Sequence, residues 1–186
     1  MSEFTYGNII RMADKPKLYE LLPTGTPTMK LNEDWLAFFT PEDGEFAASE
    51  LPKNLSECCP ILYFTHLEDH GWGFELFQEG QVISSLQVLY ELMDEEFEEM
   101  MDEYDEEEAS LFEGYMKQNP DADAFKVFGL NNEQIKSIEE LLAGNLGFDD
   151  GEEFVAVEKF KELLGIEEMS WIRYDRTVDR EEIEYV

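Results

Sequence analysis

Basic residues are scarce in this chain. Only 13 of its 186 residues are lysine or arginine, against 45 aspartates and glutamates, and the formal net charge is −32. Nucleic acids and anionic membranes attract clustered basic residues, so we do not expect this protein to bind either of them as its main function. The charge instead favours basic proteins, polyamines or divalent cations as partners.

Cysteine is also rare, and the two cysteines are adjacent, as Cys58 and Cys59. A disulfide between neighbours strains the backbone, and two thiols are too few for a disulfide framework or a four-cysteine zinc site. The nearby carboxylates of Glu57, Glu68 and Asp69 disfavour a reactive thiolate. We expect two reduced, partly buried thiols, and a reactive or redox-sensing pair is the alternative.

Long apolar runs are missing as well: a run such as residues 60–64 is far too short to cross a bilayer. The first residues lack the basic start and apolar stretch of a signal peptide. Fourteen phenylalanines, eight tyrosines and three tryptophans are nevertheless ample for a packed core. We predict a folded, cytoplasmic, single-domain protein over residues 1–186. The alternative is a soft division near residues 119–120, between a β-rich part, 1–118, and a helix-rich part, 119–186.

The sequence patterns that mark catalysis are absent too. There is no nucleophile elbow, Walker loop, dinucleotide-binding glycine pattern or paired-histidine zinc motif. The only histidines, His66 and His70, flank Glu68 and Asp69, a set that suits a metal ion only if the side chains converge. We interpret them as ordinary residues of a turn. We therefore predict no catalytic residue, no cofactor and no bound metal.

A β pattern is present between residues 60 and 90. Residues 60–67 form a buried-type apolar run, and residues 72–78 alternate between apolar and polar. A Glu-Gly turn at residues 79–80 leads into a third strand, 81–90. These three strands predict an antiparallel meander. We also predict a strand at 34–40, a loop at 41–57, and a proline-rich loop before residue 34 that follows a short helix.

The hydrophobic period then changes from two to about 3.6 residues, which is the period of a helix. Apolar side chains at 93, 97, 100 and 104 predict a helix that starts near residue 91. Further helices are predicted at 133–142, after an Asn131 or Asn132 cap, and at 152–164, before Gly165. A late strand is predicted at 170–176, followed by a loose tail. The expected fold class is α+β: a small antiparallel β-meander packed against several helices, with a late C-terminal strand.

The helix predicted from residue 91 concentrates the charge, because residues 91–113 hold thirteen acidic side chains and no basic one. Five like-charge pairs four residues apart cost this helix about 1–2.5 kcal/mol in total, which burial of its apolar stripe must offset. Five of the carboxylates lie opposite that stripe, at Glu95, Glu99, Asp102, Glu106 and Glu113.

This acidic face has several interpretations. It is a solvated face that keeps the protein soluble, a docking surface for a basic protein (a DNA mimic included), or a weak divalent-metal site without an EF-hand loop. Adaptation of a whole proteome to high salt is a further alternative. We predict a non-catalytic, bacterial-style binding protein of the inhibitor or immunity type, which docks a basic partner through these carboxylates. The alternative is a small-ligand protein or enzyme with its site in the aromatic sheet region near His66, His70 and Trp72.

The remaining candidates are arginines and aromatics. Three of the four arginines, Arg173, Arg176 and Arg180, cluster near the C-terminus. We expect them to pair with nearby carboxylates, and an anion-binding spot or a subunit contact is the alternative. Four aromatic residues are expected in the interface between sheet and helices: Trp35, Trp72, Phe74 and Trp171.

Overall fold

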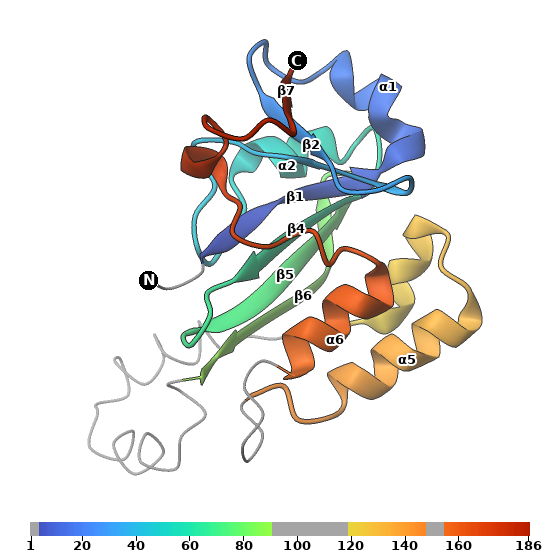
Figure 1. Ribbon diagram of the computed structural model, residues 1–186. Helices are drawn as coiled ribbons and strands as arrows, with labels where there is room; N and C mark the ends of the chain where they lie inside the picture. Colours follow the sequence, from blue (N-terminus) through green and yellow to red (C-terminus); the bar gives the residue numbers. More distant parts are fainter. Residues whose placement is uncertain (1–3, 91–118, 148–154) are drawn as a thin grey trace, which may run out of the picture.

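A seven-stranded antiparallel sheet forms the centre of the computed structural model, which describes residues 4–90, 119–147 and 155–186 (Figure 1). The strand order across the sheet is β6-β5-β4-β1-β3-β2-β7. The strands are β1 (Thr5–Arg11), β2 (Pro27–Lys30), β3 (Trp35–Phe38), β4 (Ile61–His66), β5 (Gly71–Gln78), β6 (Gln81–Leu89) and β7 (Ile183–Tyr185).

Helices cover both faces of this sheet. Helices α5 (Asn132–Leu142) and α6 (Val155–Leu164), with the 3₁₀ helix η3 (Ala122–Phe128), pack on one face. Helices α1 (Lys15–Tyr19) and α2 (Glu50–Leu55) pack on the other face. Two short 3₁₀ helices, η1 (Met12–Asp14) and η4 (Tyr174–Arg176), lie in connections. The predicted α+β class is confirmed.

The predicted meander is confirmed as β4, β5 and β6. Its second turn is the two-residue loop Glu79-Gly80, between the paired residues Gln78 and Gln81. Both loop residues have positive φ, 52° and 73°, which is the geometry that matches the twist of the flanking strands. The meander therefore follows from local turn chemistry and strand periodicity.

The prediction of a loop before residue 34 was incomplete, because β1 and β2 form there. Strand β1 lies in the middle of the sheet, paired with β4 on one side and β3 on the other. A Cβ atom on Gly7 would lie 2.6 Å from the ring of Phe39, so the glycine makes room for that ring. This strand depends on its neighbours in space, which local sequence does not reveal.

The predicted loop at 41–57 was also incomplete, because it contains α2. The strand predicted at 170–176 was wrong. Ile172 is extended beside the start of β1, where its carbonyl accepts a hydrogen bond from Tyr6 N at 3.1 Å, but the chain then curls into η4. The late strand forms instead at β7, within the expected loose tail, and pairs with β2.

Helices α5 and α6 confirm two predicted helices. Asn131 caps α5 in a reciprocal box with Gln134, whose side-chain oxygen accepts from Asn131 N at 3.0 Å. Gly165, at φ 72°, ends α6. The helix predicted from residue 91 lies outside the described residues, as do residues 152–154. The domain boundaries stay a prediction, although residues from both sides of 119–120 share the core.

Phe160 of α6 is the centre of the main core. Its ring stacks on Phe74 with centroids 5.2 Å apart and on Phe64 at 6.1 Å. It also meets Trp72 at 5.3 Å and Phe125 of η3 at 5.9 Å. All five rings are essentially inaccessible to solvent. This cluster therefore joins α6 and η3 to the sheet.

A smaller core lies on the opposite face, where Leu18 of α1 and Leu55 of α2 pack against Ile10, Phe38 and Ile61. Both faces of the central strands are thus covered, which explains why β4 is buried along its whole length. Among the described residues, no helix combines the length and apolar character needed to cross a membrane.

We predict that Phe160→Ala lowers the free energy of unfolding by about 3–5 kcal/mol, because it opens a cavity among four other rings. Urea denaturation followed by tryptophan fluorescence measures this. Val178→Ala is the control: Val178 is 75% exposed, and its truncation should change stability by no more than about 0.5 kcal/mol. A loss below about 1 kcal/mol for Phe160→Ala would contradict the central place of this ring.

Candidate functional site

The five carboxylates predicted to dock a partner, Glu95, Glu99, Asp102, Glu106 and Glu113, lie outside the described residues. The structure therefore leaves that prediction as it stands. The candidate site below is built from other residues.

An acidic groove of about 480 Å³ lies where the β2–β3 turn meets the end of α6 and the segment before α5. Glu33 and Asp34 come from the turn, Glu162 from the last turn of α6, and Glu167 from the chain just after it. All four side chains are exposed. We use the name acidic groove for the surface around Glu33, Asp34, Glu162 and Glu167.

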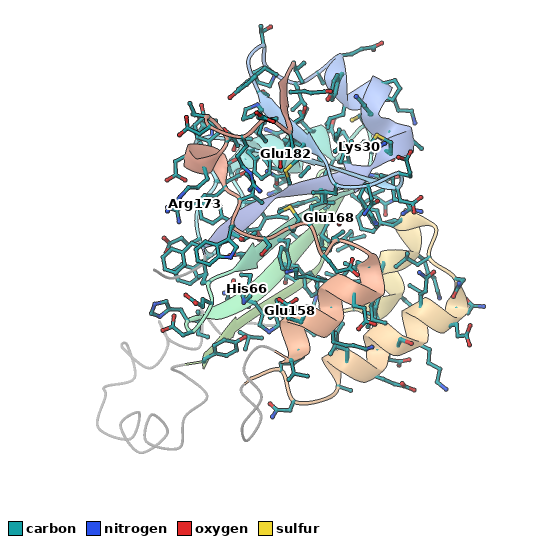
Figure 2. All side chains as sticks on the ribbon, in the orientation of Figure 1. Lys30, His66, Glu158, Glu168, Arg173 and Glu182 are labelled. Atoms are coloured by element: carbon teal, nitrogen blue, oxygen red, sulfur yellow. The ribbon has the colours of Figure 1, made fainter. Side chains whose placement is uncertain are left out.

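Two hydrogen bonds fix the walls of the acidic groove to each other. Trp35 Nε1 donates to the carbonyl of Leu164 at 2.8 Å, and Asn32 Nδ2 donates to the carbonyl of Gly165 at 2.8 Å. Both carbonyls belong to the end of α6, where helix carbonyls have no partner within the helix. The side chains of the β2–β3 turn thus supply hydrogen-bond donors to these carbonyls, and the same bonds hold the turn against the end of α6. Asn32 Nδ2 also lies 3.3 Å from Glu168, which is labelled in Figure 2.

Arg11 is the one basic residue, within the part of the chain that the structure describes, that lines the acidic groove. Its guanidinium carbon lies 4.6 Å from the centre of the Trp35 ring, in a cation–π contact. At the edge, Lys30 pairs with Glu33 at 2.5 Å and Lys159 pairs with Glu162 at 3.0 Å. Asp34 and Glu167 form no ion pair with any other described residue. The groove therefore already holds one cationic side chain and keeps unneutralised carboxylates beside it.

A second polar cluster lies on the opposite face of the sheet, under the loop of residues 41–49. Asn8 Nδ2 donates to Asp43 at 2.5 Å, and the backbone N–H of Ser49 donates to the same carboxylate at 2.8 Å. The backbone N–H of Ala48 donates to Glu75 at 2.9 Å. Two hydroxyls complete the set by donating to loop carbonyls: Tyr63 to Gly44 and Thr65 to Glu45.

Burial of this second cluster shifts the pKa values of two of its side chains, Glu75 and Tyr63. Burial raises the pKa of Glu75, the hydrogen bond from Ala48 opposes the rise, and nearby Asp43 adds to it. Burial also raises the pKa of Tyr63. Perturbed groups of this kind can mark a functional site, but here their polar atoms are used to hold the loop. We therefore interpret the cluster as a structural anchor.

The two cysteines behave as predicted. Both are free thiols, with Cys59 buried and the two sulfur atoms 3.6 Å apart. Burial, with Cys58 beside it, raises the pKa of the Cys59 thiol. A raised pKa keeps the thiol protonated, which disfavours the alternative of a reactive pair.

The two histidines occupy different surroundings. His66 is buried within β4 (Figure 2), whereas His70 is partly exposed in the turn that follows, 3.6 Å from Asp69 and edge-on to Phe4. Within residues 4–90, 119–147 and 155–186, no three histidine, cysteine or acidic side chains gather as a metal site would require. The His66–His70 segment thus presents no cation site in the described chain.

Three of the four aromatics expected in the core are there. Trp35, Trp72 and Phe74 are buried, and Trp72 Nε1 donates to the carbonyl of Leu146 at 3.1 Å. The prediction for Trp171 was wrong, since 47% of this residue is exposed and its backbone has a φ of 55°. Its neighbour Ile172 takes the buried position instead.

The arginine cluster forms internal pairs, as expected. Arg173 holds Asp175 through two hydrogen bonds of 2.6 and 3.1 Å, which raise the pKa of Arg173 and lower that of Asp175. Arg180 lies 3.9 Å from Glu182 and donates to the carbonyl of Trp171 at 3.3 Å. Arg176 is exposed.

Sequence reasoning missed the acidic groove. Its only local indication is the run Glu33-Asp34-Trp35, two carboxylates before an aromatic residue. The opposite wall is about 130 residues further along the chain, at Glu162 and Glu167. No periodicity connects two segments at such a separation.

We predict that replacing Glu75 by glutamine changes how stability depends on pH. A glutamine oxygen can still accept from Ala48, but it carries no charge to bury. Burial raises the pKa of Glu75 in the folded state. The stability that Glu75 adds to the folded protein is therefore complete at low pH, where the carboxyl is protonated, and is lost as pH rises through that pKa. The unfolding free energy of the wild type relative to Glu75→Gln should therefore fall as pH rises above 4.5, the ordinary value, towards the raised pKa of folded Glu75. Urea titrations of both proteins at fixed ionic strength measure it, and a difference that stays constant or rises with pH would contradict this account.

Comparisons with known proteins do not identify this chain: no protein-family model matches it, and neither a curated protein nor a solved structure resembles it significantly.

Proposed function

We propose that this chain is a non-catalytic binding protein that docks a basic protein partner through its acidic surface. The observation that carries the proposal is the acidic groove, in which an arginine already rests on an aromatic ring beside four carboxylates. The partner would present arginine side chains of its own to this groove.

The chemistry of the acidic groove suits a guanidinium group. Guanidinium is planar and donates several hydrogen bonds in a fixed fork, which two neighbouring carboxylates can accept. Asp34 and Glu167, which have no ion pair with other described residues, are the acceptors most open to a partner. The net charge of −32 would speed the encounter with a basic protein and make the association salt-sensitive.

The carboxylates predicted from the sequence remain part of this proposal. Glu95, Glu99, Asp102, Glu106 and Glu113 are supported by charge density alone, since residues 91–113 carry thirteen acidic residues and no basic one. A partner that normally binds nucleic acid is a special case of the same proposal, with carboxylates in place of phosphates. A cytoplasmic location, where thiols stay reduced, is compatible with the free Cys58 and Cys59.

The alternative function, a small-ligand site or enzyme in the aromatic sheet region, has weaker support. Phe64, Trp72 and Phe74 are at most 1% exposed, and their rings fill the space between the sheet and α6. Close-packed rings of this kind leave no room for a ligand among them. We therefore favour the binding function.

Three charge-matched variants test the proposal. The groove variant carries Glu33→Gln, Asp34→Asn, Glu162→Gln and Glu167→Gln. The segment variant carries Glu95→Gln, Glu99→Gln, Asp102→Asn and Glu106→Gln. The control variant carries Glu20→Gln, Glu139→Gln, Asp179→Asn and Glu181→Gln, four exposed residues outside the acidic groove. Every variant loses four negative charges, so differences between them report position rather than net charge.

The measurement is fluorescence anisotropy with a labelled twelve-residue peptide of alternating glycine and arginine, at about 0.02 and 0.15 M salt. Four exposed ion pairs at roughly 0.2–1 kcal/mol each should weaken binding of the groove variant about fourfold or more. The control variant should stay within about twofold of the wild type, because distant exposed charges are screened. Equal affinities for all three variants would show that only net charge matters and would overturn a defined docking site.

A further inference from the structure

A second, smaller pocket shares no lining residue with the acidic groove and differs from it in chemistry. It has a volume of about 220 Å³ and is formed by the loop before β2, the start of the 41–49 loop, α2 and η4. Three prolines, Pro23, Pro27 and Pro41, line it together with Leu51 and Tyr174. We use the name proline pocket for this site.

Each wall of the proline pocket is held in place. The loop before β2 is tied to the C-terminal strand region, since Gly25 N donates to the carbonyl of Val186 at 2.6 Å and Val186 N donates to that of Thr26 at 3.1 Å. The 41–49 loop is anchored to the sheet by the cluster around Asp43 and Glu75. The pocket is thus formed before any partner arrives.

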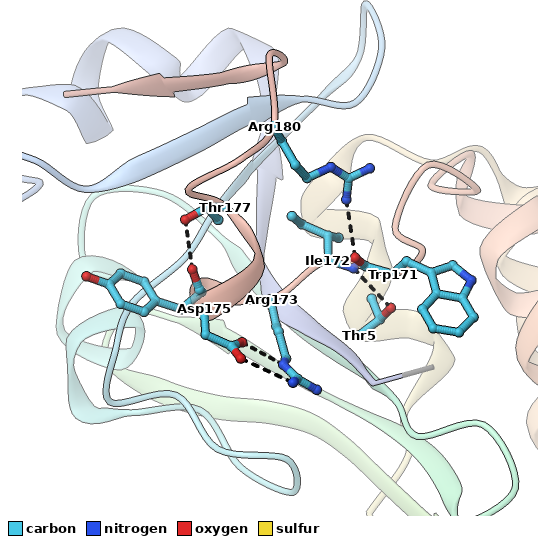
Figure 3. A network of polar contacts seen from close by, with 8 residues as sticks. Thr5, Trp171, Ile172, Arg173, Asp175, Thr177 and Arg180 are labelled. Carbon is cyan, nitrogen blue, oxygen red and sulfur yellow. Dashed lines mark hydrogen bonds and ion pairs between the residues drawn. The ribbon is translucent and has the colours of Figure 1, made fainter. Parts of the chain in front are cut away.

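The η4 wall is fixed by side-chain bonds that Figure 3 shows. The Arg173–Asp175 ion pair closes the turn, and the hydroxyl of Thr177 donates to the carbonyl of Tyr174 at 2.7 Å. Tyr174 itself stays 38% exposed. An exposed tyrosine on a fixed backbone supplies contact area at little entropic cost.

Charge around the proline pocket is sparse and of one sign. Among the described residues, Glu42 is the only charged one that lines it; Glu42 is exposed and has no ion pair with any of the others. The lining mixes prolines, Leu51 and Tyr174 with three threonines. Such a mixed pocket with one exposed carboxylate matches a side chain that has an apolar stem and a positive end. Lysine is that side chain, because it buries its methylenes along apolar surface and keeps its ammonium in water.

We propose that the proline pocket receives a lysine side chain of the basic partner, with the stem against Leu51 and Tyr174 and the ammonium beside Glu42. This inference rests on the proposed function, because it requires a basic partner. It assigns different groups to the two sites: guanidinium to the acidic groove, which four carboxylates line, and ammonium to the proline pocket, which one carboxylate lines.

Backbone amide NMR titrations test this at about 0.15 M salt, with Nα-acetyl-lysine methylamide as the probe. The norleucine analogue has the same stem without the charge. We expect saturable shifts at Gly25, Thr40 and Leu51 with the lysine probe. Binding should weaken by up to about fivefold with norleucine or in Glu42→Gln, the size expected for one exposed ion pair. Tyr174→Ala should weaken it further, while unchanged amide signals elsewhere confirm that this variant is folded.

Unshifted pocket amides, equal binding of lysine and norleucine, or equal binding to wild type and Glu42→Gln would each overturn the proposal. A parallel titration with the arginine analogue, followed at Asn32, Gly129 and Gly165, reports on the acidic groove. A response in the groove without one in the proline pocket refutes this inference alone. A pocket response with a silent groove supports this inference and counts against the groove as the docking site.

Discussion

The packing of Phe160 against the sheet is the interaction on which the rest of the structure depends. Its ring joins residues from β4, β5 and η3 in one cluster, and it fixes the position of α6. Helix α6 then places Glu162 and Glu167 opposite Glu33 and Asp34, so the acidic groove is a consequence of the apolar core. Burial of these apolar rings must also outweigh the electrostatic repulsion within a chain of net charge −32. Water and salt screen that repulsion where the charged side chains are exposed.

Several polar groups of the described chain are used to build the fold. Asp43 and Glu75 hold the 41–49 loop, Asp175 holds Arg173, and the indole of Trp35 caps the end of α6. Among the exposed carboxylates without an ion pair to another described residue, three line one of the two pockets. They are Asp34 and Glu167 in the acidic groove and Glu42 at the proline pocket. Such carboxylates provide both charge and shape, which a uniformly solvated acidic face does not.

Sequence patterns predicted those elements whose causes are local. The β4–β6 meander follows from alternation and the Glu79-Gly80 turn, and α5 follows from Asn131 and its apolar stripe. Strands β1, β2 and β7 escaped prediction because they depend on tertiary pairing: Gly7 makes room for Phe39, and the three residues of β7 are held by β2. The strand predicted at 170–176 does not form, because the chain turns into η4 after Arg173, where Arg173 pairs with Asp175. Neither wall of the acidic groove could be matched to the other from sequence, because only the packing of α6 brings them together.

Binding of a basic partner is the central proposal for this protein. Affinity capture from a lysate of the native host, with the purified protein as bait and with stepwise salt elution, tests it. We expect one dominant captured protein with a basic isoelectric point, bound in a fixed ratio to the bait and released as salt rises. Capture of neutral or acidic proteins that salt does not release, or of no protein at all, would contradict it.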